Sequence, residues 1–514
     1  MSGFKKLASD TALYGVSTIL GRLLNWALVP LHTYIFSQPQ ALSSNVELYN
    51  AIGTLLILYT LGLETAFFRY AARNRNQLEV YFSRSLSIVL VVTALFTIPA
   101  IVFSGDIARA LEYTGQQKFI RWAALILAID AVTALPFARL RVENKARRFV
   151  TAKILNVLIV IALNLFFLIF CRDVYNGEYL TFLQPFVDLI YDPTLGPGYI
   201  FLANLIANAC YFLLIRNAFK GFRFQWDNQQ VQTLLLYAFP MMLTNLVGNI
   251  NMSTDRYFLR HFLPEGFYPG LSSKDALGIY GNCYKLSVFI TLAINSFRFA
   301  ADPFFFSRAE DKNAPDLLAN VTKWFVIVCV MIWVGVSLNL DAIGLLIGEN
   351  YRSGLPVVPV LMLANLMLGI FYNLAFWFKL TDKTSYGTLI TVIGTVVTIL
   401  LNILLIPVLG YMGCAVAFLA SSVVMTVICY YLGEKHYPVP YNVPSALGYL
   451  LSGGLLIYFA TQIRIGNLWL ALLYHQVLFG LYLAAMLVIE RDTFGPLLAK
   501  WRSGRRPAGV EEKI

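Results

Sequence analysis

Fourteen apolar stretches, each about long enough to cross a bilayer, follow one another from about Thr11 to Ile489. A transmembrane helix needs about 20 apolar residues, whereas a membrane β-strand is about half as long and alternates in polarity. The chain is 58% hydrophobic and 13% charged, outside the balance of a soluble domain. We therefore expect an all-α integral membrane protein with about 14 transmembrane helices. The expected spans are residues 12–36, 47–69, 83–104, 118–138, 149–171, 198–216, 231–258, 277–300, 320–338, 355–378, 385–407, 410–432, 443–463 and 467–489.

The net charge of +11 is explained by membrane topology. Most of the 39 Lys and Arg residues fall in every second loop and at the two ends of the chain. Because basic loops stay in the cytoplasm, this bias predicts a multi-pass protein with both termini cytoplasmic. It also removes the main argument for a nucleic-acid partner. Six cysteines are scattered singly, so the sequence predicts no disulfide framework, no metal site and no cofactor.

An internal repeat predicts how the spans are grouped. Residues 14–36 align without a gap on residues 237–259, and FRYAA at 68–72 matches FRFAA at 297–301. The copies lie six helices apart and enter the membrane from the same side, which predicts two pseudo-symmetric six-helix bundles around a central cavity. The expected units are an N-terminal bundle at 1–226, a C-terminal bundle at 227–441, an extra helix pair at 442–490 and a basic cytoplasmic tail at 491–514.

The longest connection, at about 172–197, mixes aromatic, acidic and proline residues. This composition fits an ordinary outside loop, a lid or a segment that lies at the membrane interface. No large extramembrane domain is expected elsewhere, and the four histidines lie far apart in the sequence. We therefore expect no enzymatic active site.

Polar residues inside the apolar spans indicate function, because a charge at mid-membrane is costly. In the first span, Arg22, Asn25 and His32 share one helical face. The seventh span carries a polar sector, and the eighth has Lys285 near its middle and an i, i+4 pair further on. The candidates in these two spans are Asn249, Asp255, Arg256, Lys285, Arg298 and Asp302.

Two interpretations of these residues stay open. In the first, Arg22 and Lys285, with Arg298 or Arg256, form a cationic cavity for an anionic headgroup such as a diphosphate, and Asn25 and Asn249 bind hydroxyl groups. In the second, they form buried ion pairs or reach to the membrane surface. The acidic candidates either bind a coupling H⁺ or Na⁺ or form plain ion pairs. They are Glu64, Asp130, Asp255 and Asp302.

Five strings in the chain carry a family resemblance. They are PLHTYIF at 30–36, GLETAFFRYAA at 62–72, STDRYFL at 253–259, ALGIYGNCYKL at 276–286 and LNILLIPVLGYMGCAVA at 401–417. Together they resemble bacterial polysaccharide-biosynthesis flippases of the Wzx type, in the multidrug/oligosaccharidyl-lipid/polysaccharide exporter superfamily. The resemblance covers residues 11–440 and implies that two bundles move an undecaprenyl-diphosphate-linked oligosaccharide across the inner membrane by alternating access. It implies a cationic cavity at Arg22, Lys285 and Arg298.

The resemblance leaves several functions open. The glycan would be destined for O-antigen, capsule or exopolysaccharide, and a polysaccharide polymerase or export machinery would be a partner. Relatives in the same superfamily flip the peptidoglycan precursor lipid II, and others are cation-coupled multidrug antiporters. A non-transporting membrane partner of a glycan synthase is a further alternative.

Overall fold

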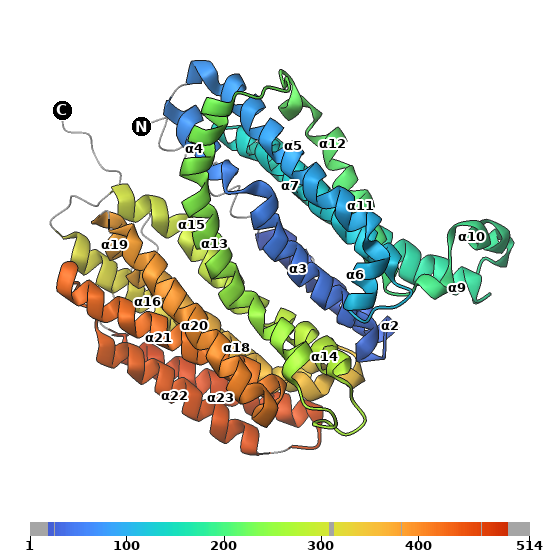
Figure 1. Cartoon of the computed structure of the whole chain (residues 1–514). Coiled ribbons are helices and arrows are strands. Elements are labelled where there is room, and N and C mark those ends of the chain that lie inside the picture. Colours follow the sequence, from blue (N-terminus) through green and yellow to red (C-terminus); the bar gives the residue numbers. More distant parts are fainter. Residues whose placement is uncertain are drawn as a thin grey trace, which may run out of the picture.

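The computed structural model describes residues 19–24, 26–73, 75–307, 313–381, 383–463 and 465–491. Regular secondary structure in these ranges is helical throughout. Two groups of long helices lie side by side, and α13 (Asn228–Phe262) runs between them (Figure 1). Residues 492–514 of the tail predicted at 491–514, and the candidate Asn25, lie outside the described residues.

The described helices match the predicted spans. Ten are long and apolar enough to cross a membrane, and the number is twelve if each of two bent pairs is counted as one span. The predicted span at 198–216 is a shorter apolar helix, Gly198–Leu214. The first predicted span lies partly outside the described residues and includes α2 (Leu28–Ile35). The chain is therefore a multi-pass membrane protein, and about 14 crossings fit both the sequence and the structure.

The N-terminal group is built around α7, which contacts α3, α4, α5, α8 and α11. Its buried side chains form a continuous apolar cluster between these helices. Short 3-10 turns at 39–42, 75–77 and 216–219 join some of the elements. The helices are α3 (Ser43–Thr60), α4 (Leu63–Arg73), α5 (Leu78–Val102), α6 (Ser104–Ala110), α7 (Gln117–Val142), α8 (Ala146–Leu165), α11 (Gly198–Ala209) and α12 (Tyr211–Leu214).

The C-terminal group packs α21 against α18 and α20, and α20 against α13. The last two helices, α22 and α23, lie on α16, as Figure 1 also shows. The exact residue boundaries between the units stay predictions. The helices are α14 (Ser273–Leu286), α15 (Val288–Ser307), α16 (Ala314–Leu338), α17 (Leu340–Gly344), α18 (Val357–Leu374), α19 (Phe376–Leu380), α20 (Thr384–Leu409), α21 (Tyr411–His436), α22 (Val443–Gln462) and α23 (Leu468–Ile489).

One span in each group is bent. The second span bends by 43° between α3 and α4, and the eighth bends by 44° between α14 and α15. Leu61 and Gly62 supply the first break with positive φ angles of 50° and 70°. The repeated FRYAA and FRFAA strings both follow the break, in α4 and in α15. Each bend therefore precedes the matching string in its own sequence copy.

The connection at 172–197 contains α9 (Arg172–Tyr175) and α10 (Gln184–Ile190), which project from the edge of the N-terminal group (Figure 1). Three apolar side chains on this segment are largely exposed: Phe182, Phe186 and Leu189. In Figure 1 the segment lies away from α13 and α14, the helices that border the central region. This arrangement resembles an interfacial segment more than a lid.

The two groups join tightly at the end predicted to be periplasmic. The turn at Pro39–Leu42 packs on α14, and the Thr33 hydroxyl accepts a hydrogen bond from the backbone N–H of Gly348 at 3.0 Å. The hydroxyl of Tyr351 donates to the carbonyl oxygen of Phe36 at 2.6 Å. These contacts close the seam between the groups at that end.

Candidate functional site

A cavity of about 540 Å³ lies between the two helix groups. One wall comes from residues 22–32, α3, α8 and α11, and the other from α13, α14 and the start of α15. Three cationic side chains, Arg22, Arg256 and Lys285, line it. The described residues that line it include no Asp and no Glu.

The cationic side chains of the cavity have closer contacts with neutral groups than with carboxylates. Lys285 donates from Nζ to the carboxamide oxygen of Asn282 at 3.1 Å, and no ion pair joins it to a described carboxylate. Arg22 has no hydrogen bond or ion pair within the described ranges. Neutral hydrogen-bond acceptors hold an ammonium in place without cancelling its charge. The cavity therefore keeps a net positive charge.

Arg256 is held on several sides. Its Nη1 donates to the carboxamide oxygen of Asn50 at 3.1 Å, and its guanidinium lies 4.0 Å from the ring centroid of Tyr284. Asp255 is at 3.8 Å, the outer limit of an ion pair, and also accepts a hydrogen bond from Tyr280. The carboxylate thus divides its charge between two partners, and Arg256 belongs to both the cavity wall and the α13–α14 interface.

Two predicted binding residues do not line the cavity. The Arg298 guanidinium stacks on Tyr372 at 4.1 Å from the ring centroid, within the C-terminal group. Asn249 accepts hydrogen bonds from Thr54 at 2.8 Å and from Ser253 at 3.1 Å, and so joins α13 to α3. In this structure both polar groups bond between helices, and their part in binding stays a prediction.

The acidic candidates have different surroundings. Glu64 forms an ion pair with Arg141 at 2.9 Å. Asp130, half-buried in the N-terminal group, accepts a hydrogen bond from Asn208 at 2.9 Å. The side chain of Asp302 lies outside the described part of the chain. Within the described ranges, no group of three His, Cys, Asp or Glu side chains could hold a metal ion.

Sequence reasoning missed most of the neutral lining. These residues are isolated carboxamides and aromatics in apolar spans, and the search for charges passed over them. Counting Asn residues in the second, fifth and sixth spans would have found several. The missed residues are Trp26, Asn45, Tyr49, Asn50, Asn164, Asn204, Asn282 and Tyr284.

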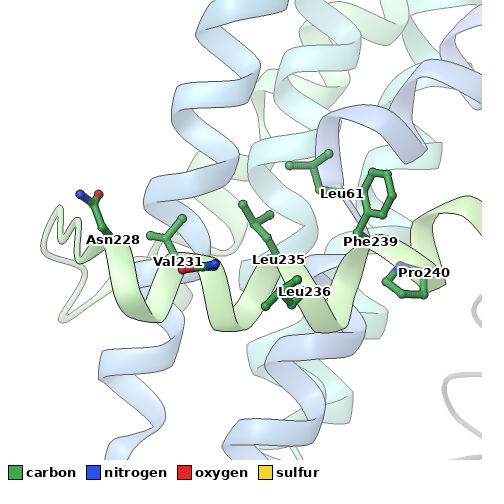
Figure 2. A pocket seen from close by; sticks show the side chains of 8 residues that line it. Leu61, Asn228, Val231, Leu235, Leu236, Phe239 and Pro240 are labelled. Carbon is green, nitrogen blue, oxygen red and sulfur yellow. The ribbon is translucent and has the colours of Figure 1, made fainter.

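A second hollow of about 700 Å³ lies beside the first turns of α13 (Figure 2). Its lining is mostly apolar, with Leu61, Leu236 and Phe239 on its surface. Asn228 and Gln232 are its only polar side chains among the described residues, and neither carries charge. This hollow fits contact with lipid, and the charged cavity is the stronger candidate site.

Comparison with protein families gives a match over more than half of the chain. The model of the polysaccharide biosynthesis protein family matches residues 7–308. This region includes the N-terminal group, α13, α14 and α15, and therefore every described residue that lines the charged cavity. A comparison with curated protein sequences gives no significant match.

Solved structures with this fold are transporters by their titles. The lipid II flippase MurJ, in an inward closed conformation, is 14% identical, with 94% of this chain and 99% of that chain covered and a TM-score of 0.66. An inward-facing multidrug resistance MATE family transporter of the MOP superfamily is 13% identical, with 83% and 97% covered and a TM-score of 0.59. An outward-facing one is 15% identical, with 84% and 94% covered and a TM-score of 0.53. At these identities the similarity establishes the fold.

Proposed function

The chain belongs to the polysaccharide biosynthesis protein family, and we propose that it is a flippase for an undecaprenyl-diphosphate-linked oligosaccharide. It moves this lipid from the cytoplasmic to the periplasmic leaflet of the bacterial inner membrane by alternating access. The glycan serves O-antigen, capsule or exopolysaccharide export, and a polymerase or export machinery receives it. Both termini lie in the cytoplasm.

The observation that carries this proposal is the net positive charge of the cavity. Arg22, Arg256 and Lys285 line it, and no described Asp or Glu does. A diphosphate needs this kind of site, because Arg donates in a planar fork to phosphate oxygens and Lys supplies a compact charge. A cation such as a typical drug substrate would be repelled, so the proposal disfavours multidrug antiport.

Coupling to a gradient of H⁺ or Na⁺ is the second part of the proposal, and Asp130 is its best candidate. Glu64 is used in an ion pair with Arg141, and Asp255 is shared between Arg256 and Tyr280. Asp130 is half-buried and its hydrogen bond comes from a neutral amide, Asn208. Such a carboxylate can take up a cation without first breaking an ion pair.

The lipid II precursor is the alternative substrate. The similarity to MurJ extends over 94% of this chain. Both substrates carry a diphosphate, so the cationic cavity suits either one. Complementation separates them: rescue of a strain that lacks its lipid II flippase would favour this alternative.

The main experiment locates the lipid-linked oligosaccharide in cells that lack the protein. We expect it to accumulate in the cytoplasmic leaflet, and expression of the wild-type chain to restore its export. Arg22→Ala and Lys285→Ala should each lower export by about tenfold or more while leaving membrane insertion intact, since a charge-assisted hydrogen bond contributes about 1.5 to 3 kcal/mol. Arg216→Ala and Lys118→Ala, which remove exposed cations elsewhere, are the matched controls.

Normal export by both cavity variants would contradict the proposal. It would favour a non-transporting partner of a glycan synthase, for which these charges are dispensable. An Asp130→Asn variant tests the coupling separately. It should transport at a rate that no longer responds to the H⁺ or Na⁺ gradient.

A further inference from the structure

Five asparagines that line the cavity share one bonding pattern. In each, the NH₂ group donates to a backbone carbonyl oxygen, so that the amide orientation is fixed and Oδ1 is presented as an acceptor. The acceptor carbonyls belong to Pro197 for Asn45 at 3.4 Å, Ser253 for Asn50 at 3.0 Å, Val160 for Asn164 at 2.8 Å, Ile200 for Asn204 at 2.9 Å and Gly278 for Asn282 at 2.8 Å.

Three of the five amide oxygens already accept a hydrogen bond from a side chain. Asn50 accepts from Arg256, Asn282 accepts from Lys285, and Asn164 accepts from Nε2 of His32 at 2.8 Å. The oxygens of Asn45 and Asn204 accept no hydrogen bond from any described residue. Both lie on the wall of the N-terminal group, on α3 and α11.

Two unpaired donors lie on the same wall. The Tyr49 hydroxyl and the Trp26 indole N–H have no hydrogen-bond partner among the described residues. The Tyr49 ring is held in place by parallel stacking on Phe201 at 5.0 Å, and Trp26 packs edge-on against Phe289 at 5.0 Å. The side chains that carry these groups are fixed, while the polar groups themselves remain unpaired.

The two walls differ in chemistry. Arg256 and Lys285 lie on the C-terminal wall and suit an anion, whereas Arg22 is the one cation that the described part of the N-terminal wall contributes. The amide oxygens of Asn45 and Asn204 would repel phosphate oxygens, because two acceptors share no hydrogen. A sugar hydroxyl both donates and accepts, and the flat faces of Trp and Tyr suit the apolar faces of a sugar ring.

We propose that Trp26, Asn45, Tyr49 and Asn204 form a subsite for the sugar residue next to the diphosphate. The inference rests on the proposed function, because Arg256 and Lys285 of the opposite wall, together with Arg22, hold the diphosphate. The lipid is then oriented across the cavity, with its phosphates toward α13 and α14 and its first sugar toward α3 and α11. Recognition of the sugar is separate from recognition of the charge.

The test compares binding of two probes to the purified full chain in detergent or nanodiscs. One probe is undecaprenyl diphosphate, and the other is the same lipid bearing one N-acetylglucosamine. Wild-type protein should bind the glycosylated probe more tightly. The double variant Asn45→Leu with Tyr49→Phe should weaken binding of the glycosylated probe by about tenfold or more, and binding of the bare lipid by less than about twofold.

A matched control is the double variant Asn402→Leu with Tyr59→Phe. Asn402 also donates its NH₂ to a helix carbonyl, has an unpaired amide oxygen and lies outside the cavity lining. This variant should bind both probes as wild type does, and thermal unfolding checks that all variants fold.

Equal affinity of wild type for the two probes, or an equal change for both in the subsite variant, would overturn the subsite. If wild type binds neither probe, the proposed function itself fails. If Lys285→Ala weakens binding of both probes and the subsite variant weakens binding of the glycosylated probe alone, the two walls recognise the diphosphate and the sugar separately.

Discussion

Gly278 on α14 packs directly against the backbone of Pro39, where a Cβ at Gly278 would lie 2.1 Å from the Pro39 carbonyl oxygen. Three residues further along α14, a Cβ at Gly281 would lie 2.5 Å from the Val46 side chain. Real carbon atoms do not approach this closely, so these glycines let the two helix groups meet at the predicted periplasmic end. An alternating-access protein must separate this contact to open outward.

Gly278→Ala should therefore separate α14 from the turn at Pro39–Leu42 and loosen the contact between the two helix groups at the predicted periplasmic end. The nearest atom is backbone and cannot rotate away, so overpacking is expected to cost about 1 to 3 kcal/mol. Cys283 is the reporter, because it lies on α14 with a fully buried thiol near Tyr351. A membrane-impermeant maleimide should label Cys283 faster in the variant, as measured by mass spectrometry. Gly53→Ala, on α3 where a Cβ meets nothing within 4 Å, should leave labelling unchanged.

Glu112 should make the same seam sensitive to acid. Its carboxylate accepts a hydrogen bond from Arg260 and lies 3.8 Å from Lys274, and these contacts lower the pKa of Glu112 below its ordinary value of 4.5. A lowered folded-state pKa adds stability that is present at neutral pH and lost as the pH falls through that lowered value. Labelling of Cys283, divided at each pH by the labelling rate of a free thiol, should therefore rise only at acid pH below 4.5 and stay flat near neutrality.

Glu112→Gln should remove that acid response by removing the titrating group. The variant should label at neutral pH as wild type does in acid. Glu178→Gln, at another exposed acid on the same side, is the control and should keep the wild-type profile. An acid response of equal size in Glu112→Gln would assign it to another group.

Asn282→Asp should weaken anion binding by giving Lys285 an acidic partner. The amide oxygen that now accepts from Lys285 at 3.1 Å would become a carboxylate oxygen, and the cavity would lose one positive charge. We expect about tenfold weaker binding of undecaprenyl diphosphate. Asn442→Asp makes the same chemical change at the N-cap of α22, where Asp caps as well as Asn, and should bind as wild type. Unchanged affinity in Asn282→Asp would remove Lys285 from the anion site.

Hydropathy was enough to predict the helices, because each span must bury its own backbone hydrogen bonds in lipid. The bends were not predictable in this way. Leu61 and Ser287 lie in continuous apolar runs, and the break depends on contacts with the other group, such as the approach of Gly62 to Ala238.

The cost of burying charge singled out Arg22 and Lys285, and the structure places both on one cavity although they are far apart in sequence. The same argument also singled out Arg298 and Asn249, which contact neighbouring helices, because a helix can satisfy a buried polar group as well as a ligand can. Asn45 and Asn204 were missed for the opposite reason. Burying a neutral amide costs little free energy once its NH₂ group is hydrogen-bonded, so such residues are common in helices that bind no ligand. Nothing in the local sequence therefore distinguishes these two asparagines.

Arg139 should contribute to stability and not to transport. Its buried guanidinium pairs with Glu143 at 2.7 Å and Glu79 at 3.6 Å, and donates to the Lys220 carbonyl oxygen at 2.6 Å. It also lies over the Phe82 ring at 4.8 Å. Arg139→Ala removes the ion pairs to Glu143 and Glu79 and the bond to the Lys220 carbonyl oxygen, while Glu143 keeps its pair with Lys145. We therefore expect a loss of about 1 to 3 kcal/mol and a lower unfolding temperature in detergent.

Arg139→Lys should recover only part of that stability, because an ammonium cannot bridge both carboxylates and a carbonyl oxygen in one plane. Arg148→Ala, at an exposed position in the same basic region, should change the unfolding temperature little. Export per folded molecule should be normal in all three variants, since Arg139 lies outside the cavity lining. A selective loss of export in a stably folded Arg139→Lys protein would instead place this residue in the transport cycle. Charges outside the cavity lining would then also contribute to transport.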